Sequence, residues 1–234
     1  MRKLTYPIGA LLAVSAAASV LVAGSASATV NSQTYRATVS PKKQPPKTFG
    51  AAALAVVIDT SYTGFNPAPS QAVLRFSRDL RFVPGNKAKC PLSSIQGRPT
   101  ATAKAACGSA VIGQGDAQLN NGGLTAAITA FNGAGGGTTV YLHVDINNGS
   151  IVLDLTGSLN TKTNTLTVAG IPNTPGSVLT HLAVKINKIK TGKKSFYVMA
   201  RCGKKKKWVS SETTTFADGT TKSATSVQKC TQKK

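Results

Sequence analysis

The chain has 234 residues, of which 28 are Lys or Arg and only seven are Asp or Glu, so its formal net charge is +21 at neutral pH. A chain of this length can form one domain with a substantial core, or two small domains. The charge favours anionic surroundings, although it bears on association and solubility and not on fold. With so few acidic groups, no spacing singles out a carboxylate pair for acid–base catalysis.

The first 28 residues have the pattern of a secretory signal peptide. Arg2 and Lys3 give a positive start, an apolar run covers residues 8–23, and Ala26-Ser27-Ala28 has the small-x-small pattern of a cleavage site. We expect cleavage after Ala28, which would lower the charge from +21 to +19. The alternative is an uncleaved anchor, but the apolar run is shorter than the ~20 residues that a spanning helix needs. No later segment is apolar enough to span a bilayer.

Residues 29–50 are predicted to form a polar lead-in and linker, with one strand over residues 34–39, before a single domain over residues 51–234. Further strands are expected over residues 51–62, 71–83, 110–119 and 124–131. The stretch between Cys90 and Cys107 is rich in Ala, Ser and Thr. We predict that this stretch is a loop containing about one turn of helix, closed at both ends.

The clearest element is a hairpin over residues 140–157. Asn148-Gly149 is the preferred pair for a two-residue type I′ turn. That turn sets Ile146 opposite Ile151 and places the apolar residues of both strands on one face, so the pattern and the turn chemistry agree.

Five more strands are expected, over residues 163–169, 179–189, 195–202, 208–216 and 220–230, with Asp218-Gly219 marking another tight turn. Short strands at near-regular spacing are typical of an all-β protein. We therefore predict an antiparallel β-sandwich of roughly 8–11 short strands.

The four cysteines are an even number, which in an exported protein argues for two disulfides. Three connectivities are available, and proximity in the sequence favours Cys90–Cys107 and Cys202–Cys230. Each bridge would contribute about 3 kcal/mol if strain is small. A zinc site is the alternative, but the sequence has no Cys-x-x-Cys pair and only two histidines.

Two parts of the chain carry a family resemblance. Cys90-Pro91 through Cys107 is followed by Ser-Ala-Val-Ile-Gly-Gln-Gly at residues 109–115, and the tail contains Cys202, Trp208, Asp218-Gly219 and Cys230 in that order. In these features the chain resembles secreted β-rich proteins of high-GC Gram-positive bacteria for which no activity is known. The resemblance implies an exported β-rich domain and carries over no catalytic residue.

His143, Asp145 and Asp154 are a candidate metal or acid–base site. The hairpin register places His143 opposite Asp154 on the outer face, with Asp145 two residues along on the same face. A histidine with two carboxylates could bind a metal or transfer a proton. The simpler interpretation is an exposed ion pair that contributes below about 1 kcal/mol. No phosphate-binding loop or other cofactor motif is present, so no cofactor is expected.

The last 50 residues hold 14 Lys and Arg against two acidic residues, a net charge of +12. The densest point is Lys204, Lys205, Lys206 and Lys207, directly before Trp208, and Lys190, Lys193 and Lys194 come shortly before it. We predict that the run is a hairpin tip that attracts phosphate and carboxylate groups without the fork geometry of arginine. Trp208 could stack on a base or a sugar ring. The alternative is a solvated turn beside a core tryptophan.

Three functions are compatible with these features. The leading hypothesis is a non-catalytic secreted or cell-surface protein that binds anionic envelope polymers or acidic glycans through its basic C-terminal region, with no specific nucleic acid as partner. The second is a secreted metal-dependent hydrolase that uses His143, Asp145 and Asp154. The third is a self-assembling structural component of the cell surface.

Overall fold

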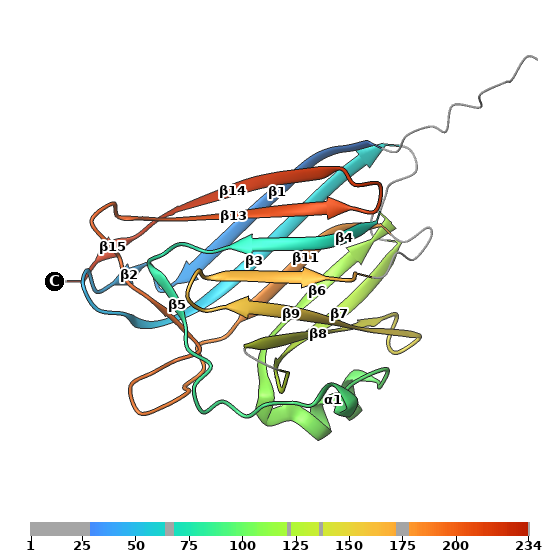
Figure 1. Cartoon of the computed structure of the whole chain (residues 1–234), viewed down its shortest axis with the longest axis horizontal. Coiled ribbons are helices and arrows are strands. Elements are labelled where there is room, and N and C mark those ends of the chain that lie inside the picture. The colour runs from blue at the N-terminus through green and yellow to red at the C-terminus, as the bar shows by residue number, and fades with distance from the viewer. Residues whose placement is uncertain (1–28, 64–67, 121–122, 136–137, 172–177, 234) are drawn as a thin grey trace, which may run out of the picture.

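The computed structural model describes residues 29–63, 68–120, 123–135, 138–171 and 178–233, and these are mostly antiparallel strands (Figure 1). The strands are β1 (Thr29–Ser40), β2 (Lys43–Gln44), β3 (Gly50–Thr63), β4 (Pro69–Arg75), β5 (Leu80–Phe82), β6 (Val111–Leu119), β7 (Leu124–Gly133), β8 (Thr139–Ile146), β9 (Ile151–Asn160), β10 (Thr165–Ala169), β11 (Leu179–Ile186), β12 (Val198–Ala200), β13 (Lys207–Phe216), β14 (Thr221–Lys229) and β15 (Thr231–Gln232). The α-helix in this part of the chain is α1 (Thr100–Cys107). No helix among the described residues is long and apolar enough to cross a membrane. The signal peptide predicted over residues 1–28 lies outside the described residues.

Thirteen strands form one continuous sheet in the order β14-β13-β4-β10-β9-β8-β7-β6-β11-β3-β12-β5, with β1 paired to β3. The remaining two, β2 and β15, form a small parallel pair. The predicted fold class is confirmed, because the sheet is antiparallel and the disulfides are Cys90–Cys107 and Cys202–Cys230. The strands are more numerous than expected partly because β2 and β15 have only two residues each, too few to show a sequence pattern. The strand expected over residues 195–202 is present but short, as β12.

The sheet bends round until β1 lies next to β14 (Figure 1). Two side chains of β14 join these strands in place of backbone pairing. The Ser226 hydroxyl accepts a hydrogen bond from the Ala37 backbone N–H at 3.0 Å. The Gln228 amide accepts one from the Val39 N–H at 2.6 Å and donates one to the Val39 carbonyl at 3.0 Å. The halves of the sheet thus face each other across an apolar layer.

The strand expected over residues 34–39 is confirmed as part of β1, which begins earlier, so that residues 29–33 also belong to the sheet. β1 pairs with β3 from Thr29 opposite Thr63 to Ser40 opposite Ala53. Tyr35, Ala37 and Val39 of β1 are buried while their neighbours are exposed or half-buried. The polar residues on the other face hide this alternation in the overall composition.

The hairpin of β8 and β9 has the predicted register, with Ile146 opposite Ile151. The turn itself differs from the expected two-residue type I′ turn, because Asn147, Asn148 and Gly149 all have positive φ, of 50°, 55° and 94°, whereas a type I′ turn has two such residues. The turn at Asp218-Gly219 is confirmed, since Gly219 has φ of 82° between the paired strands β13 and β14.

The single strand expected over residues 71–83 is two strands, β4 and β5, separated by a turn. The Leu80 N–H donates to the Ser77 carbonyl at 2.9 Å and closes this turn. Asn164, from the chain just before β10, donates its side-chain amide to the carbonyls of Ser77 and Leu80 at 3.2 and 2.8 Å. The break therefore depends on a residue more than 80 positions away.

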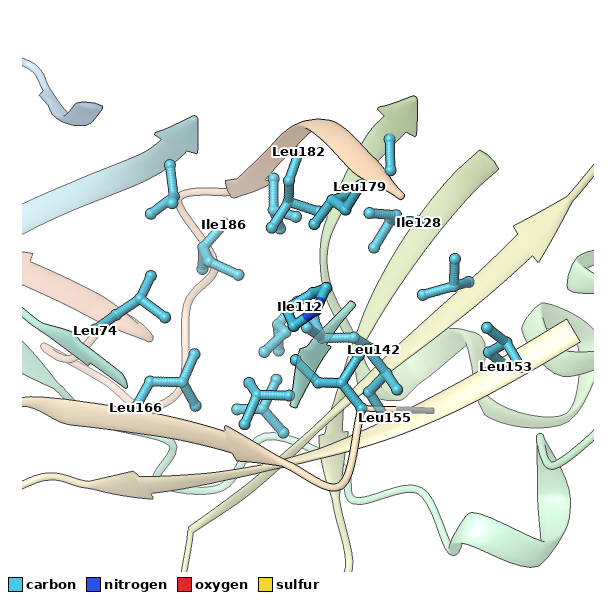
Figure 2. A pocket seen from close by; sticks show the side chains of 18 of the residues that line it. Leu74, Ile112, Ile128, Leu142, Leu153, Leu155, Leu166, Leu179, Leu182 and Ile186 are labelled. Carbon is cyan, nitrogen blue, oxygen red and sulfur yellow. The ribbon is translucent and has the colours of Figure 1, made fainter. Parts of the chain in front are cut away.

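The interior between the two halves is not completely filled. An apolar cavity of about 210 Å³ lies there (Figure 2). Leu142, Leu155 and Leu182 point into the cavity and are only half-buried, although they face the inside of the sheet.

Small residues on the inner face of β6 help to explain the space. Gly113 and Gly115 lie opposite Ile186 and Val184 of β11, two residues that line the cavity. A Cβ atom at Gly115 would lie 1.9 Å from the Ala183 carbonyl oxygen, so the close approach of β6 and β11 requires glycine. These positions can contribute no side chain to fill the interior.

Candidate functional site

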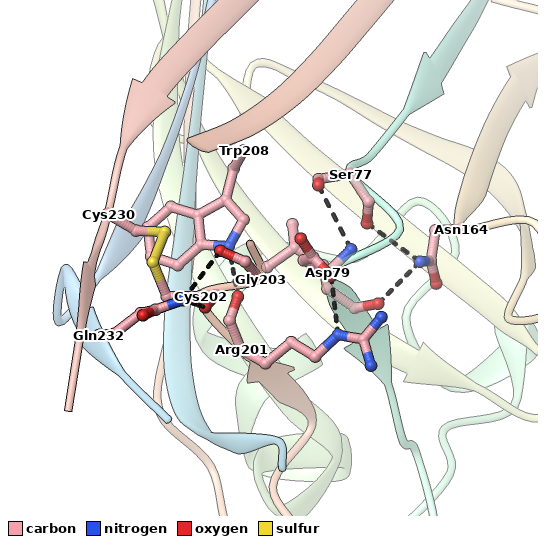
Figure 3. Close-up of polar contacts among 10 residues, drawn as sticks. Ser77, Asp79, Asn164, Arg201, Cys202, Gly203, Trp208, Cys230 and Gln232 are labelled. Atoms are coloured by element: carbon pink, nitrogen blue, oxygen red, sulfur yellow. Dashed lines mark hydrogen bonds and ion pairs between the residues drawn. A yellow bond between two sulfur atoms is a disulfide. The ribbon is translucent and has the colours of Figure 1, made fainter. Parts of the chain in front are cut away.

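The lysine run lies at the end of the sheet where β4 ends and β3 and β13 begin, which we call the basic end. Figure 3 shows the contacts around the residues that flank this run. Cys202 is bonded to Cys230, and the Trp208 ring N–H donates to the Arg201 carbonyl at 2.8 Å. Gln232 donates to the carbonyls of Cys202 and Gly203 at 3.1 and 3.2 Å. These contacts fix the backbone from which the lysines project.

The lysine run is a turn but not the tip of a hairpin. The Lys206 N–H donates to the Gly203 carbonyl at 3.0 Å, and Lys206 has φ of 50°. However, β12 before the turn pairs with β3 and β5, whereas β13 after it pairs with β14 and β4. The hairpin prediction is wrong because contacts with distant strands, and not the turn itself, decide where β12 and β13 lie.

A surface depression of about 820 Å³ lies beside this turn, and we call it the basic depression. Its charged lining consists of six cationic side chains and one carboxylate: Lys47, Arg78, Arg201, Lys204, Lys205, Lys207 and Asp79. The four lysines are exposed, as is Arg78. Three separate parts of the chain therefore bring positive charge to one hollow.

Asp79 neutralises one of these cations. The Arg201 Nε atom donates to the Asp79 carboxylate at 2.7 Å, and the Arg201 backbone N–H donates to the Asp79 carbonyl at 2.9 Å. The Arg201 guanidinium also lies 5.1 Å from the centre of the Phe49 ring, within the range of a cation–π contact. Arg201 is thus held in place, and five cations of the depression have no carboxylate partner among the residues that line it.

The predicted binding residues divide into two groups. Lys204, Lys205 and Lys207 line the basic depression, whereas Lys206 is exposed outside it. Lys190, Lys193 and Lys194 do not line it either. They belong to the loop between β11 and β12, in which the Thr191 N–H donates to the Ser195 carbonyl at 3.0 Å.

Trp208 lies in the core, as the alternative interpretation of this region expects. It is only 2 % exposed, and its ring N–H is already bonded to Arg201. Its ring is therefore not available to stack on a sugar or a base. Lys47, Arg78 and Arg201 also line the depression but were not predicted as binding residues, because only folding brings these separate parts of the chain to the lysine turn.

His143 and Asp154 form the predicted pair, with 2.7 Å between the His143 Nδ1 and Asp154 Oδ1 atoms. The pair is buried, however, and the expectation of an exposed pair is wrong. The segment from Cys90 to Cys107, closed by its disulfide, packs against Phe131 on the outer face of the sheet. This covering segment leaves the His143 side chain with no exposed surface.

The two carboxylates beside His143 hold the covering segment. Asp145 accepts hydrogen bonds from the Thr100 hydroxyl at 2.6 Å and the Thr100 N–H at 3.2 Å, and Asp154 accepts one from the Gly97 N–H at 2.9 Å. The bond from the Thr100 hydroxyl is the main reason that the pKa of Asp145 lies below its ordinary value. Among the described residues, no three His, Cys, Asp or Glu side chains are placed to hold a metal ion. A hydrolytic role for these residues stays a prediction.

Comparison with known proteins does not assign the chain to a family. No family model matches the sequence, and no curated protein matches it. The resemblance to secreted proteins of high-GC Gram-positive bacteria stays a prediction.

Proposed function

We propose that the protein is a non-catalytic, exported binding protein that attaches to anionic polymers of the cell envelope or its surroundings through the basic depression. The observation that carries this proposal is the convergence of five cations without a carboxylate partner on one hollow of about 820 Å³. A repeating anionic polymer can meet several of these cations at once.

Two features support the exported location. Disulfides such as Cys90–Cys107 and Cys202–Cys230 are typical of proteins that fold in an oxidising compartment. Residues 1–28 have the signal-peptide pattern given above. Outside the cell, phosphate-bearing and carboxylate-bearing polymers are available as partners.

The chemistry of the depression favours many weak contacts over one specific contact. An exposed ion pair contributes about 0–1 kcal/mol, so a single phosphate or carboxylate would bind weakly. A polymer gains affinity because binding at one cation raises the local concentration of its other groups near the remaining cations. Because the lysine side chains are exposed, salt will screen the attraction.

Retention on anionic resins during a salt gradient tests this proposal, with heparin and immobilised polyphosphate as the probes. One variant replaces Lys204, Lys205 and Lys207 with Gln, and the matched control replaces Lys190, Lys193 and Lys194 with Gln. Both lose three positive charges. We expect the first variant to elute at clearly lower salt than the control on both resins, because only it removes three of the four lysines that line the depression.

Two results would contradict the proposal. If both variants elute together, retention follows net charge and the depression has no special role. If the wild-type protein stays on the resins at a salt concentration of about 1 M, where the Debye length is about 3 Å, the attraction is not electrostatic.

A further inference from the structure

We propose that the interior cavity is a second binding site, which takes a single extended alkyl chain. This inference is independent of polymer binding and assigns a different ligand class to a different part of the molecule.

The walls of the cavity favour a hydrocarbon ligand. The residues that line it carry no charged side chain. Leu142, Leu153 and Leu155 come from β8 and β9, and they face Leu179 and Leu182 of β11 across the cavity (Figure 2). These leucines are only half-buried, so an apolar ligand that covers them removes apolar surface from water.

The shape of the cavity favours a chain over a compact ring system. Along β9 the lining extends from Ile151 to Leu159, eight residue steps or about 26 Å of strand. The lining is therefore elongated along the strands, and a chain that fills about 210 Å³ occupies only part of this length. In another protein, a cavity of about 150 Å³ holds one benzene molecule, so the volume here suits a chain of about eight to ten carbons.

The entrance lies at the end of the sheet opposite the basic end. Ile151, directly after the β8–β9 turn, lines the cavity and is 48 % exposed. At the other end the cavity is closed by Phe82, which is in contact with Phe76 at 5.2 Å between ring centres, and by Tyr197, which is 1 % exposed. A chain therefore enters beside Ile151, and its polar end group stays at the entrance.

A series of straight-chain 1-alkanols from about 6 to 14 carbons tests the ligand class, with calorimetry or displacement of a neutral fluorescent dye as the readout. Alkanols carry no charge, so the net charge of the protein does not attract them. We expect affinity to rise about fourfold for each added methylene group until the cavity is full, and then to level off. Cyclic alcohols of equal carbon number should bind at least about tenfold more weakly. Equal binding of the cyclic alcohols, or no binding of any alkanol, overturns the proposal.

Two pairs of variants test the location. Ile151→Asp places a charge at the entrance, and its control Val227→Asp changes another exposed apolar residue, 60 % exposed, that does not line the cavity. Leu155→Trp fills the cavity, and its control Thr156→Trp places the same ring on the outer face of the same strand. We expect Ile151→Asp and Leu155→Trp each to weaken 1-decanol binding at least about tenfold, with little change in the controls.

The far-ultraviolet circular dichroism spectrum and the urea-unfolding midpoint show whether each variant is folded. A loss of alkanol binding in a variant that unfolds cooperatively, as the wild type does, supports the assignment. If Ile151→Asp is folded and binds 1-decanol as tightly as Val227→Asp does, the assignment of the entrance is wrong even if Leu155→Trp fails to fold.

Discussion

Glu212, the only glutamate of the chain, is fully buried on the inner face of β13. Its carboxylate accepts a hydrogen bond from the Gln33 side-chain amide at 2.8 Å and another from the Thr214 hydroxyl. Removal from water raises the pKa of Glu212 above its ordinary value, although both hydrogen bonds oppose the shift. Burial is also the main cause of a raised pKa at Tyr35, and the charge of Glu212 raises it further.

The raised pKa of Glu212 predicts a stability that falls with rising pH. Above its ordinary pKa of 4.5 the unfolded chain loses this proton while the native protein keeps it. The free energy of unfolding therefore decreases by up to about 1.4 kcal/mol per pH unit until the raised native pKa is reached. The Glu212→Gln side chain has no carboxyl group to titrate, so we expect its contribution to the free energy of unfolding to be independent of pH. The variant should therefore be more stable than the wild type at neutral pH. Urea unfolding between about pH 4 and pH 8 measures both profiles.

The glutamine variant should also keep its partners. The Gln33 Oε1 atom is buried without a hydrogen-bond partner, so it can accept a bond from the new amide. Thr102→Lys, which raises the net charge by the same one unit at an exposed position, controls for the change in net charge. Parallel pH profiles for wild type and Glu212→Gln would show that Glu212 does not titrate as argued.

At the scale of elements, a hairpin could be predicted from the local sequence pattern, whereas the surface against which a distant segment packs could not. The β8–β9 hairpin follows from Asn148-Gly149 and from apolar residues at every second position, all within about 20 residues. The covering segment between Cys90 and Cys107 depends instead on hydrogen bonds from Thr100 to Asp145 and from Gly97 to Asp154, across 45 and 57 residues. Its Ala-rich, Ser-rich and Thr-rich composition gives no pattern that identifies this partner surface.

Thr100→Val tests how the covering segment is held. The variant removes the hydroxyl that bonds to Asp145, so we expect a loss of about 1–2 kcal/mol at pH 7. Because that hydrogen bond lowers the pKa of Asp145, its contribution is present above the ordinary pKa of 3.8 and is lost as the pH falls through the lower native value. The stabilities of variant and wild type should therefore converge in acid.

Thr102→Val is the matched control, because Thr102 is exposed on the same helix. Amide hydrogen exchange adds a local readout: protection in α1 should fall in Thr100→Val while the protection of the sheet is retained. Equal unfolding midpoints for the two variants at pH 7 would contradict the role given to Thr100.

For the whole molecule, the two proposed sites lie at opposite ends of the strands. The basic depression is formed where β4 ends and β13 begins, and Ile151 lies at the end where β8 and β9 are joined. Attachment to a polymer through the lysines would therefore leave the entrance of the cavity facing away from that polymer. Neither site was evident as a whole from the sequence, because both are assembled from strands far apart along the chain.

The interior cavity depends on the curvature of the sheet, and Gln228 is one of the side chains that join β1 to β14. Its primary amide both accepts and donates a hydrogen bond, as a backbone peptide group of a neighbouring strand would, and so satisfies the N–H and carbonyl of Val39. Val39 is only 2 % exposed. We expect Gln228→Ala to lower the free energy of unfolding by about 2–4 kcal/mol, because two buried backbone groups lose their partners.

The matched control is Gln114→Ala, at an exposed position of β6, where the change should cost less than about 0.5 kcal/mol. Urea unfolding measures both variants, and hydrogen exchange should show faster opening of β1 and β14 in Gln228→Ala than of the central strands β7 and β8. If Gln228→Ala lowers the free energy of unfolding and the cavity binds an alkyl chain, then 1-decanol should restore part of the stability of this variant. The reason is that a ligand that binds only the folded state stabilises that state. Equal stability of the two alanine variants would mean that the contact between β1 and β14 depends on apolar packing and not on the Gln228 amide.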